Sequence, residues 1–314
     1  MKNSSITKVG ILGVPLGFAA SQVGSELGVD SMRLSRIRGR RLIEHIAELG
    51  YPVVDHGNVE IIRPESPAQP HENPKYLAEI VASLKNAFDD VSSILKSGET
   101  PVILGGDHST AIGTFSAIAS HANVGDQEVG LIWFDAHADI NTPETSPTGN
   151  IHGMPLAVLL GDGPKELVEL GGFSPKLDAK YFAHIGARDL DAGEQRRVYE
   201  KSLRNNFFTM SDIDRRGMQS CIDDALEIVS QAPGGFAVTF DVDSIDPRFA
   251  PGSGTLVRGG LTYREAHLAL ETIAAHNGLR SFEIVEVNPM LDHSNITVEL
   301  ACELVLSALG KTIL

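Results

Sequence analysis

The sequence predicts an α/β fold in three layers, with a mostly parallel central sheet covered by helices on both faces. Two patterns support this prediction. Short apolar runs of strand length alternate with longer helix-length runs, an order typical of βαβ units and a parallel sheet. Charged side chains also follow several of the apolar runs directly, at the strand ends where ligands of such sheets usually bind.

The predicted strands are short runs rich in Val, Ile, Leu and Phe. In chain order they are Val9–Val14, Pro52–Asp55, Val102–Leu104, Leu131–Phe134, Tyr181–Ile185, Phe236–Phe240 and Phe282–Val287. A first strand explains the apolar N-terminal segment better than a signal peptide does, because Pro15 and three glycines interrupt that segment.

The predicted helices are the helix-length patterns between these strands. They are Tyr76–Lys96, Met218–Gln231, Tyr263–His276 and Val298–Leu309. The segment Glu60–Asn73 is rich in Pro and is predicted to be a surface loop. Because neither a repeat nor a linker interrupts the chain, we expect residues 1–314 to form a single domain.

Composition narrows the possible partners and locations. The chain has 314 residues and a formal charge of −15, which repels phosphate backbones and argues against a nucleic-acid partner. No run approaches the roughly 20 apolar residues of a membrane span. The two cysteines, Cys221 and Cys302, lack the spacing of a zinc finger and make a disulfide scaffold unlikely. We therefore expect a cytoplasmic protein.

Acidic and imidazole side chains follow three of the predicted strands and lie at the end of a fourth, Phe282–Val287. In chain order they are Asp107 and His108, then Asp135, His137 and Asp139, then Asp241 and Asp243, and finally Glu286. The alternating positions of the second group place those three side chains on one face of an extended segment. Singly, such residues have ordinary explanations, such as a helix cap for Asp107 or a hydrogen-bonded core histidine for His108. Together they would repel one another unless a cation compensated them.

Two divalent ions that share bridging carboxylates account for this set better than one ion, which would leave negative charge in excess. Mixed carboxylate and imidazole ligands favour a metal such as manganese over thiolate-seeking metals. Paired ions about 3.5–4 Å apart lower the pKa of a water molecule between them and supply hydroxide near neutral pH. The sequence therefore predicts a hydrolase, without naming the bond that it cleaves.

Four separated motifs make the chain resemble the ureohydrolase family and, within it, the arginases. The motifs are GGDHS at Gly105–Ser109, DAHADIN at Asp135–Asn141, DVDSIDP at Asp241–Pro247 and EVNP at Glu286–Pro289. The resemblance implies the arginase-like three-layer fold and a homo-oligomer, either a trimer or a hexamer. It also implies hydrolysis of the guanidinium group of L-arginine to L-ornithine and urea by a hydroxide that bridges two Mn²⁺ ions per subunit.

The resemblance further implies a role for each residue of the metal site. His108, Asp135, Asp139 and Asp241 would hold one ion, and Asp135, His137, Asp241 and Asp243 would hold the other. Asp139 would take the proton of the hydroxide, and Glu286 would hold the guanidinium group in line. His152 would help to deliver a proton to the leaving amine, since an imidazole with a pKa near 6.5 can shuttle protons.

The loop Thr142–Gly153 resembles the one that recognises the amino-acid end of the substrate in arginases. By similarity, Asn141 and Thr148 would donate hydrogen bonds to the α-carboxylate. Asp191, with Glu194 in its outer shell, would receive the α-ammonium, and Thr255 would be a secondary contact near Glu286. The family more often has serine at the position of Thr148, and threonine keeps the hydroxyl donor. Taken alone, Asn141 and Thr148 are also ordinary turn residues, and Asp191 an ordinary surface-loop acid.

Two other functions stay open from the sequence. An agmatinase or other guanidino-acid ureohydrolase would have the same metals and a different loop at the substrate end. A non-catalytic, metal-stabilised or regulatory subunit would bind metal without hydrolysing a substrate. The complete set of ligand positions, together with Glu286 and His152, argues against the second alternative.

Overall fold

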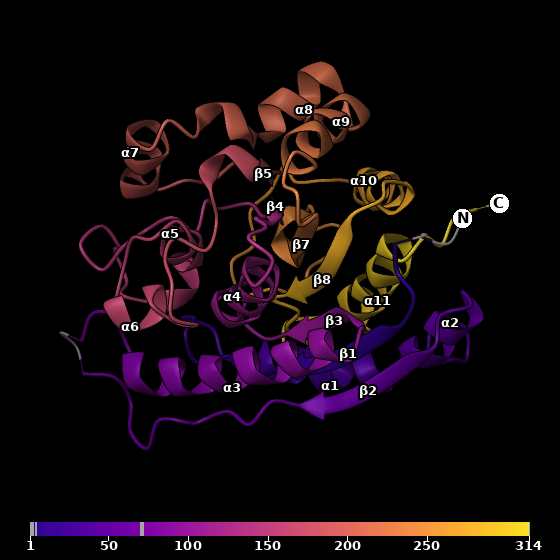
Figure 1. Ribbon diagram of the computed structural model, residues 1–314, viewed down its shortest axis with the longest axis horizontal. Helices are drawn as coiled ribbons and strands as arrows, with labels where there is room; N and C mark the ends of the chain where they lie inside the picture. Colours follow the sequence, from indigo (N-terminus) through magenta and orange to yellow (C-terminus); the bar gives the residue numbers. More distant parts are fainter. Residues whose placement is uncertain (1–2, 4, 70–71, 314) are drawn as a thin grey trace.

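The computed structural model describes residues 3, 5–69 and 72–313, and its centre is an eight-stranded sheet in the order β2-β1-β3-β8-β7-β4-β5-β6 (Figure 1). Every pair of neighbouring strands is parallel. The strands are β1 Val9–Val14, β2 Val53–Asn58, β3 Thr100–Gly105, β4 Gly130–Phe134, β5 Phe182–Ile185, β6 Phe207–Phe208, β7 Phe236–Asp241 and β8 Leu279–Val285. The predicted α/β fold with a parallel sheet is confirmed.

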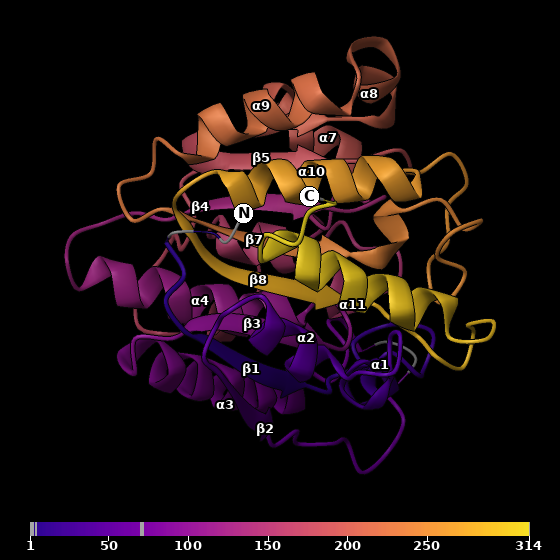
Figure 2. The same cartoon turned by 90° about the vertical axis from the view of Figure 1, so that its right-hand side faces the viewer.

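Helices cover both faces of the sheet and complete the three layers. One face packs against α1 Glu26–Leu34, α2 Leu42–Glu48, α8 Met210–Arg216, α9 Met218–Val229, α10 Tyr263–Ala275 and α11 Ile296–Ala308. The other packs against α3 Leu77–Lys96, α4 Thr110–Asn123, α5 Pro155–Leu159, α6 Lys165–Val168 and α7 Ala192–Glu200. In Figure 2, α10 and α11 lie in front of the sheet. Each of the two helical layers therefore packs against its own face of the sheet and buries a separate apolar core there.

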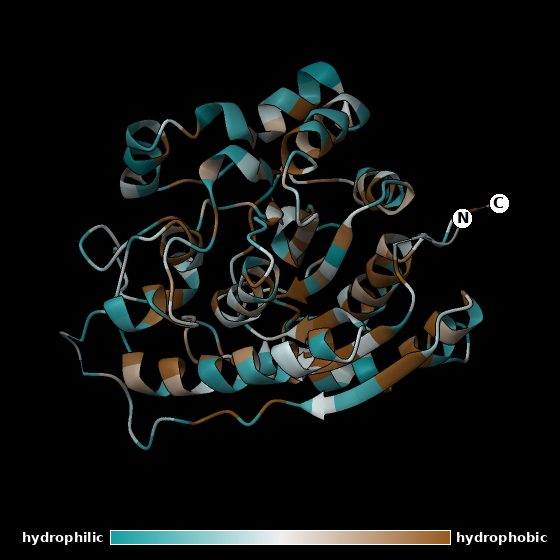
Figure 3. Ribbon diagram, in the orientation of Figure 1, coloured by the Kyte–Doolittle hydropathy of each residue, from teal (hydrophilic) through white to brown (hydrophobic). Residues whose placement is uncertain are grey.

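The outer helices follow the apolar periodicity of their sequences. In α3 the buried residues recur every three or four positions, from Ile80 and Leu84 to Val91 and Ile94, so they form a single stripe facing the sheet. Figure 3 shows this stripe as alternating brown and teal segments along the helix. Helix α4 differs because its first ten residues, Thr110–Ala119, are all buried. It lies inside the protein and has no polar face by which the sequence could reveal it.

The predicted helices agree with α3, α9, α10 and α11 to within two residues at each end. The predicted strand Phe282–Val287 was placed too far along the chain: β8 ends at Val285, and Glu286 adopts a left-handed backbone conformation with φ of 63°, which a strand cannot accommodate. The edge strand β6 was not predicted, since it has only two residues.

The predicted loop Glu60–Asn73 has neither helix nor strand in its described residues 60–69 and 72–73, and Pro70 and His71 lie outside the described part of the chain. In the part of the chain that the structure describes, no helix has both the length and the apolar character needed to cross a membrane.

Candidate active site

The carboxyl ends of four neighbouring strands bring the predicted site residues together. Because β3, β8, β7 and β4 are adjacent and parallel, the residues that follow them meet at one edge of the sheet. After β3 the backbone at Gly105-Gly106 passes close to the backbone of Leu16. Only glycine fits there, since a Cβ atom on Gly106 would lie 1.8 Å from the carbonyl oxygen of Leu16. A residue with a side chain would push this turn, and His108 with it, out of place.

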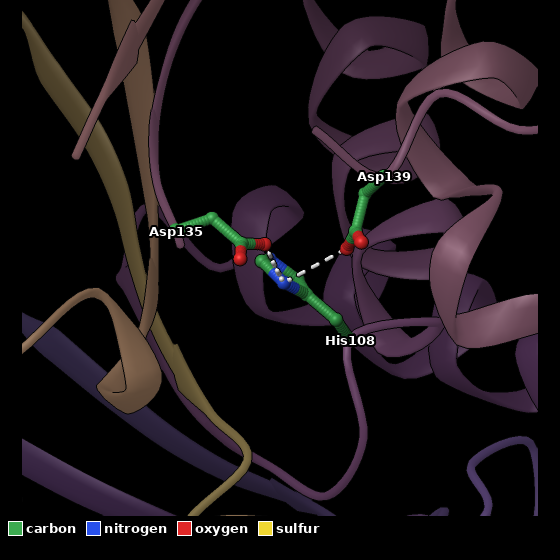
Figure 4. A group of neighbouring side chains, drawn as sticks. All are labelled: His108, Asp135 and Asp139. Atoms are coloured by element: carbon green, nitrogen blue, oxygen red, sulfur yellow. Dashed lines mark ion pairs between the residues drawn. The ribbon is translucent and has the colours of Figure 1, made fainter. Parts of the chain in front are cut away.

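Three carboxylates surround one nitrogen of His108. The Nδ1 atom lies 3.0 Å from Oδ2 of Asp135, 3.2 Å from Oδ2 of Asp139 and 3.2 Å from Oδ2 of Asp241. Figure 4 shows the first two carboxylates pointing at the imidazole from opposite sides. All four side chains are buried, and Nδ1 nevertheless has no hydrogen-bond partner. An imidazole nitrogen that faces three carboxylate oxygens at 3.0–3.2 Å is placed as a metal ligand would be.

A second donor group shares Asp135 with the first. Nδ1 of His137 lies 3.3 Å from Oδ1 of Asp135 and 3.1 Å from Oδ2 of Asp243. The ligand atoms of His108, Asp135 and Asp139 lie within 4.8 Å of one another, and so do those of Asp135, His137 and Asp243. The two oxygens of Asp135 thus face the two histidines separately, as expected for a carboxylate that bridges two ions. Asp241 lies beside His108 through Oδ2, while its Oδ1 accepts the backbone N–H of Asp243 at 2.7 Å.

The electrostatics of the cluster favour a bound cation. Burial and the neighbouring Asp135 carboxylate raise the pKa of Asp139 to about 7. Burial, followed by Asp243 and Asp135, raises the pKa of Asp241 well above its ordinary value. Such carboxylates take up protons unless another positive charge replaces them. Nitrogen and oxygen donors in this proportion suit a divalent metal ion, so the residues present fit two such ions.

A buried chain of hydrogen bonds fixes the orientation of His108. Thr239 on β7 pairs in register with Glu283 on β8, and its hydroxyl donates to Oε1 of Glu283 at 2.9 Å. Thr239 Oγ1 must then accept from Nε2 of His108, which lies 3.1 Å away, because a hydroxyl has a single proton. With a metal bound, this contact would keep the proton of His108 on Nε2 and leave the Nδ1 lone pair for the ion, a common arrangement of ligand histidines. Thr239 and Glu283 were not among the predicted site residues, although both are polar residues within apolar strands.

Glu286 and His152 lie against each other at the side of the cluster. Oε1 of Glu286 is 3.3 Å from Nδ1 of His152 and accepts the backbone N–H of His108 at 3.1 Å. Burial lowers the pKa of His152, but Glu286 raises it more, to about 9. This pKa lies above the ordinary imidazole value near 6.5. Asp139 and Glu286 both have positive φ values, 49° and 63°, which cost free energy in residues other than glycine.

A cavity of about 190 Å³ is lined by three of the predicted metal ligands and by all five predicted substrate-binding residues. It is lined by His137, Asp139, Asn141, Ser146, Pro147, Thr148, Asn150, His152, Gly153, Asp191, Glu194, Asp241 and Thr255. The hydroxyl of Thr255 donates to Oδ2 of Asp243 at 2.8 Å. It thus supports a metal-type ligand directly.

The far end of the cavity is a small hydrogen-bonded network. Nδ2 of Asn141 donates to Oδ2 of Asp191 at 2.8 Å. Asp191 also caps α7, where its Oδ1 accepts the backbone N–H groups of Gly193 and Glu194. It is thus a helix cap and not an ordinary loop acid. Oγ1 of Thr148 accepts the backbone N–H of Asn150 at 3.2 Å. Burial, followed by the nearby Asp139 and Asp191, raises the pKa of Glu194 to about 8.

Comparisons with known proteins agree with this geometry. The family model described as "Arginase family" matches residues 7–310. The arginase of Bacillus subtilis strain 168 is 42% identical over 306 residues, 98% of this chain and 99% of that protein. The arginase of Brevibacillus brevis is 40% identical over 97% of this chain and 98% of its own.

Solved structures give the same result. A crystal structure of the Bacillus caldovelox arginase superposes with a TM-score of 0.89 at 37% identity, covering 98% of this chain and all of the other. A hypothetical agmatinase from Burkholderia thailandensis, 24% identical with a TM-score of 0.70 and covering 96% of this chain and 84% of its own, shows the shared fold alone. With a family model matched over nearly its whole length and relatives near 40% identity, the chain belongs to the arginase family of metal-dependent hydrolases.

Proposed function

We propose that this site hydrolyses the guanidinium group of L-arginine to L-ornithine and urea, with two Mn²⁺ ions in each subunit. The observation that carries the proposal is the pair of donor groups around Asp135, which opens into the cavity that Asn141, Thr148 and Asp191 line. His108, Asp135, Asp139 and Asp241 would hold one ion, and Asp135, His137, Asp241 and Asp243 the other. When bound, two such ions lower the pKa of a water molecule between them and supply hydroxide near neutral pH.

The side chains around the cluster would do the rest of the chemistry. Glu286 would hold the guanidinium group, because a carboxylate can accept two parallel hydrogen bonds from this planar cation. The Asp139 carboxylate, on the cavity wall, would accept the proton of the nucleophile. His152, already protonated beside Glu286, would deliver a proton to the leaving amine.

The far end of the cavity would recognise the amino-acid part of the substrate. Asn141 and Thr148 would donate to the α-carboxylate, and Asp191 would receive the α-ammonium with Glu194 beside it. Agmatine has the ammonium and lacks the carboxylate. The cavity therefore has donors that arginine can use and agmatine cannot, which supports arginine as the substrate over the agmatinase alternative.

Replacing Asn141 with Asp tests this assignment. A carboxylate at this position would repel the α-carboxylate of arginine, and we expect the KM for arginine to rise at least about tenfold, since a like charge in a partly buried site costs 1.4 kcal/mol or more. Turnover of agmatine should stay nearly unchanged. Steady-state urea release from both compounds measures the effect, and an unchanged KM for arginine would refute the role of Asn141.

Other features of the proposal rest on the sequence. We expect residues 1–314 to act as a single domain, which the one sheet running from β1 to β8 supports. Assembly into a trimer or hexamer and a cytoplasmic location remain predictions of the sequence.

A further inference from the structure

A segment from a distant part of the chain holds the loop that carries Thr148. Residues 72–76 lie just before α3, whereas the loop follows β4. Nδ2 of Asn73 donates to the carbonyl oxygen of Pro143 at 2.6 Å, and the backbone N–H of Lys75 donates to the carbonyl oxygen of Gly149 at 2.9 Å. The segment therefore contacts the loop near both of its ends.

The side chain of Lys75 continues this contact up to the cavity wall. Its Nζ atom donates to Oδ1 of Asn150 at 2.9 Å. Asn150 is 4% exposed and lines the cavity, and its Nδ2 atom donates to Oγ of Ser21 at 2.6 Å. The backbone N–H of the same residue donates to Thr148. The ammonium of Lys75 thus lies one side chain behind the wall, next to the residue proposed to bind the α-carboxylate.

This ammonium is unusual in its surroundings. The ionisable residues that line the cavity are four acids, Asp139, Asp191, Glu194 and Asp241, and two histidines, His137 and His152. Within the described residues, Lys75 is the only lysine or arginine whose side chain hydrogen-bonds a cavity-lining side chain. No ion pair of the described chain includes it. Arg197, which binds the carbonyl oxygen of Ile140 nearby, is paired with Asp162 instead.

We propose that Lys75 is a specificity-determining residue, whose ammonium selects guanidino compounds that carry a carboxylate at the far end of the cavity. This inference rests on the proposed function. A positive charge without an acidic partner attracts the carboxylate of an incoming amino acid. It repels a substrate such as agmatine, which has only an ammonium at that end. Because the site is partly buried, salt screens this effect less than it would on an open surface.

The test compares Lys75→Met, which keeps most of the aliphatic stem and removes the charge, with Lys75→Arg, which keeps the charge. We expect Lys75→Met to raise the KM for L-arginine about tenfold, as for loss of one charge interaction in a partly buried site. Its kcat should stay within about twofold, and its kcat/KM for agmatine should be unchanged or higher. Lys75→Arg should restore most of the preference for arginine. Lys165→Met, on the exposed surface of α6, serves as the matched control.

The outcomes separate charge from structural support. Lys75→Met could lose the same fraction of kcat/KM for arginine and for agmatine, and Lys75→Arg could fail to restore it. That result would show that the residue only supports the loop, and it would overturn the proposal. If the wild type prefers arginine and Lys75→Met leaves the KM for arginine unchanged, this proposal alone is overturned. A wild type that prefers agmatine would overturn the proposed function and this inference with it. Thermal unfolding of each variant identifies any loss of folding. If Lys75→Met does not fold, the comparison of Lys75→Arg with the wild type tests the proposal instead.

Discussion

Replacing Asp135 with Asn will abolish arginine hydrolysis and remove bound metal. The two carboxylate oxygens of Asp135 face His108 and His137 separately, at 3.0 Å and 3.3 Å. Asparagine keeps the size of the side chain but offers one neutral oxygen, so it cannot bridge two ions. We expect kcat to fall at least about 1000-fold, or about 4 kcal/mol of transition-state stabilisation.

Metal analysis of the purified variant, together with urea release, measures this effect. The metal content should fall below the two ions per subunit expected of the wild type. Asp223→Asn is a matched control, because Asp223 lies on the exposed face of α9 and accepts a hydrogen bond from Gln219. A variant at Asp135 that keeps two ions and near-normal turnover would refute the bridging role.

Replacing Glu286 with Gln should cause the second largest loss of activity, through weaker binding of the guanidinium group and not through loss of metal. Glutamine cannot offer the two charged acceptors that hold a guanidinium group, and losing one partner of a buried, charged hydrogen-bonded pair costs about 2–5 kcal/mol. We expect kcat/KM to fall by about 100- to 1000-fold for arginine and agmatine alike, since both carry the guanidinium group. Metal content should stay unchanged, because Glu286 belongs to neither donor group.

The comparison of the two substrates is the decisive part of this experiment. Glu299→Gln, on the exposed side of α11, controls for the loss of one negative charge. If Glu286→Gln lost activity toward arginine and kept it toward agmatine, Glu286 would belong to the amino-acid end of the cavity. Loss of metal from this variant would instead assign it to the metal site.

The sequence predicted those parts of the site that depend on local spacing. Asp135, His137 and Asp139 are close in the chain, and the parallel order of the strands brings His108 and Asp241 to the same edge. The backbone conformation of Glu286 was not predictable in this way. Its left-handed φ occurs directly after β8 ends, whereas the apolar run around it is typical of a longer strand.

Contacts between segments that are distant in the chain could not be predicted from the sequence either. Thr239 and Glu283 support His108 only because β7 and β8 pair in a particular register. Likewise, Lys75 meets Asn150 because the segment before α3 folds over the loop after β4. Neither register nor loop packing follows from periodicity, which reports only which face of a strand or helix is buried.

The most direct test of arginase activity is urea release by the wild-type protein from equal concentrations of L-arginine and agmatine. The protein is assayed after incubation with manganese and again after chelation. We expect manganese-dependent turnover of arginine, little turnover of agmatine, and loss of both on chelation. A preference for agmatine would contradict the roles of Asn141, Thr148 and Asp191, and activity that survives complete removal of metal would contradict the mechanism itself.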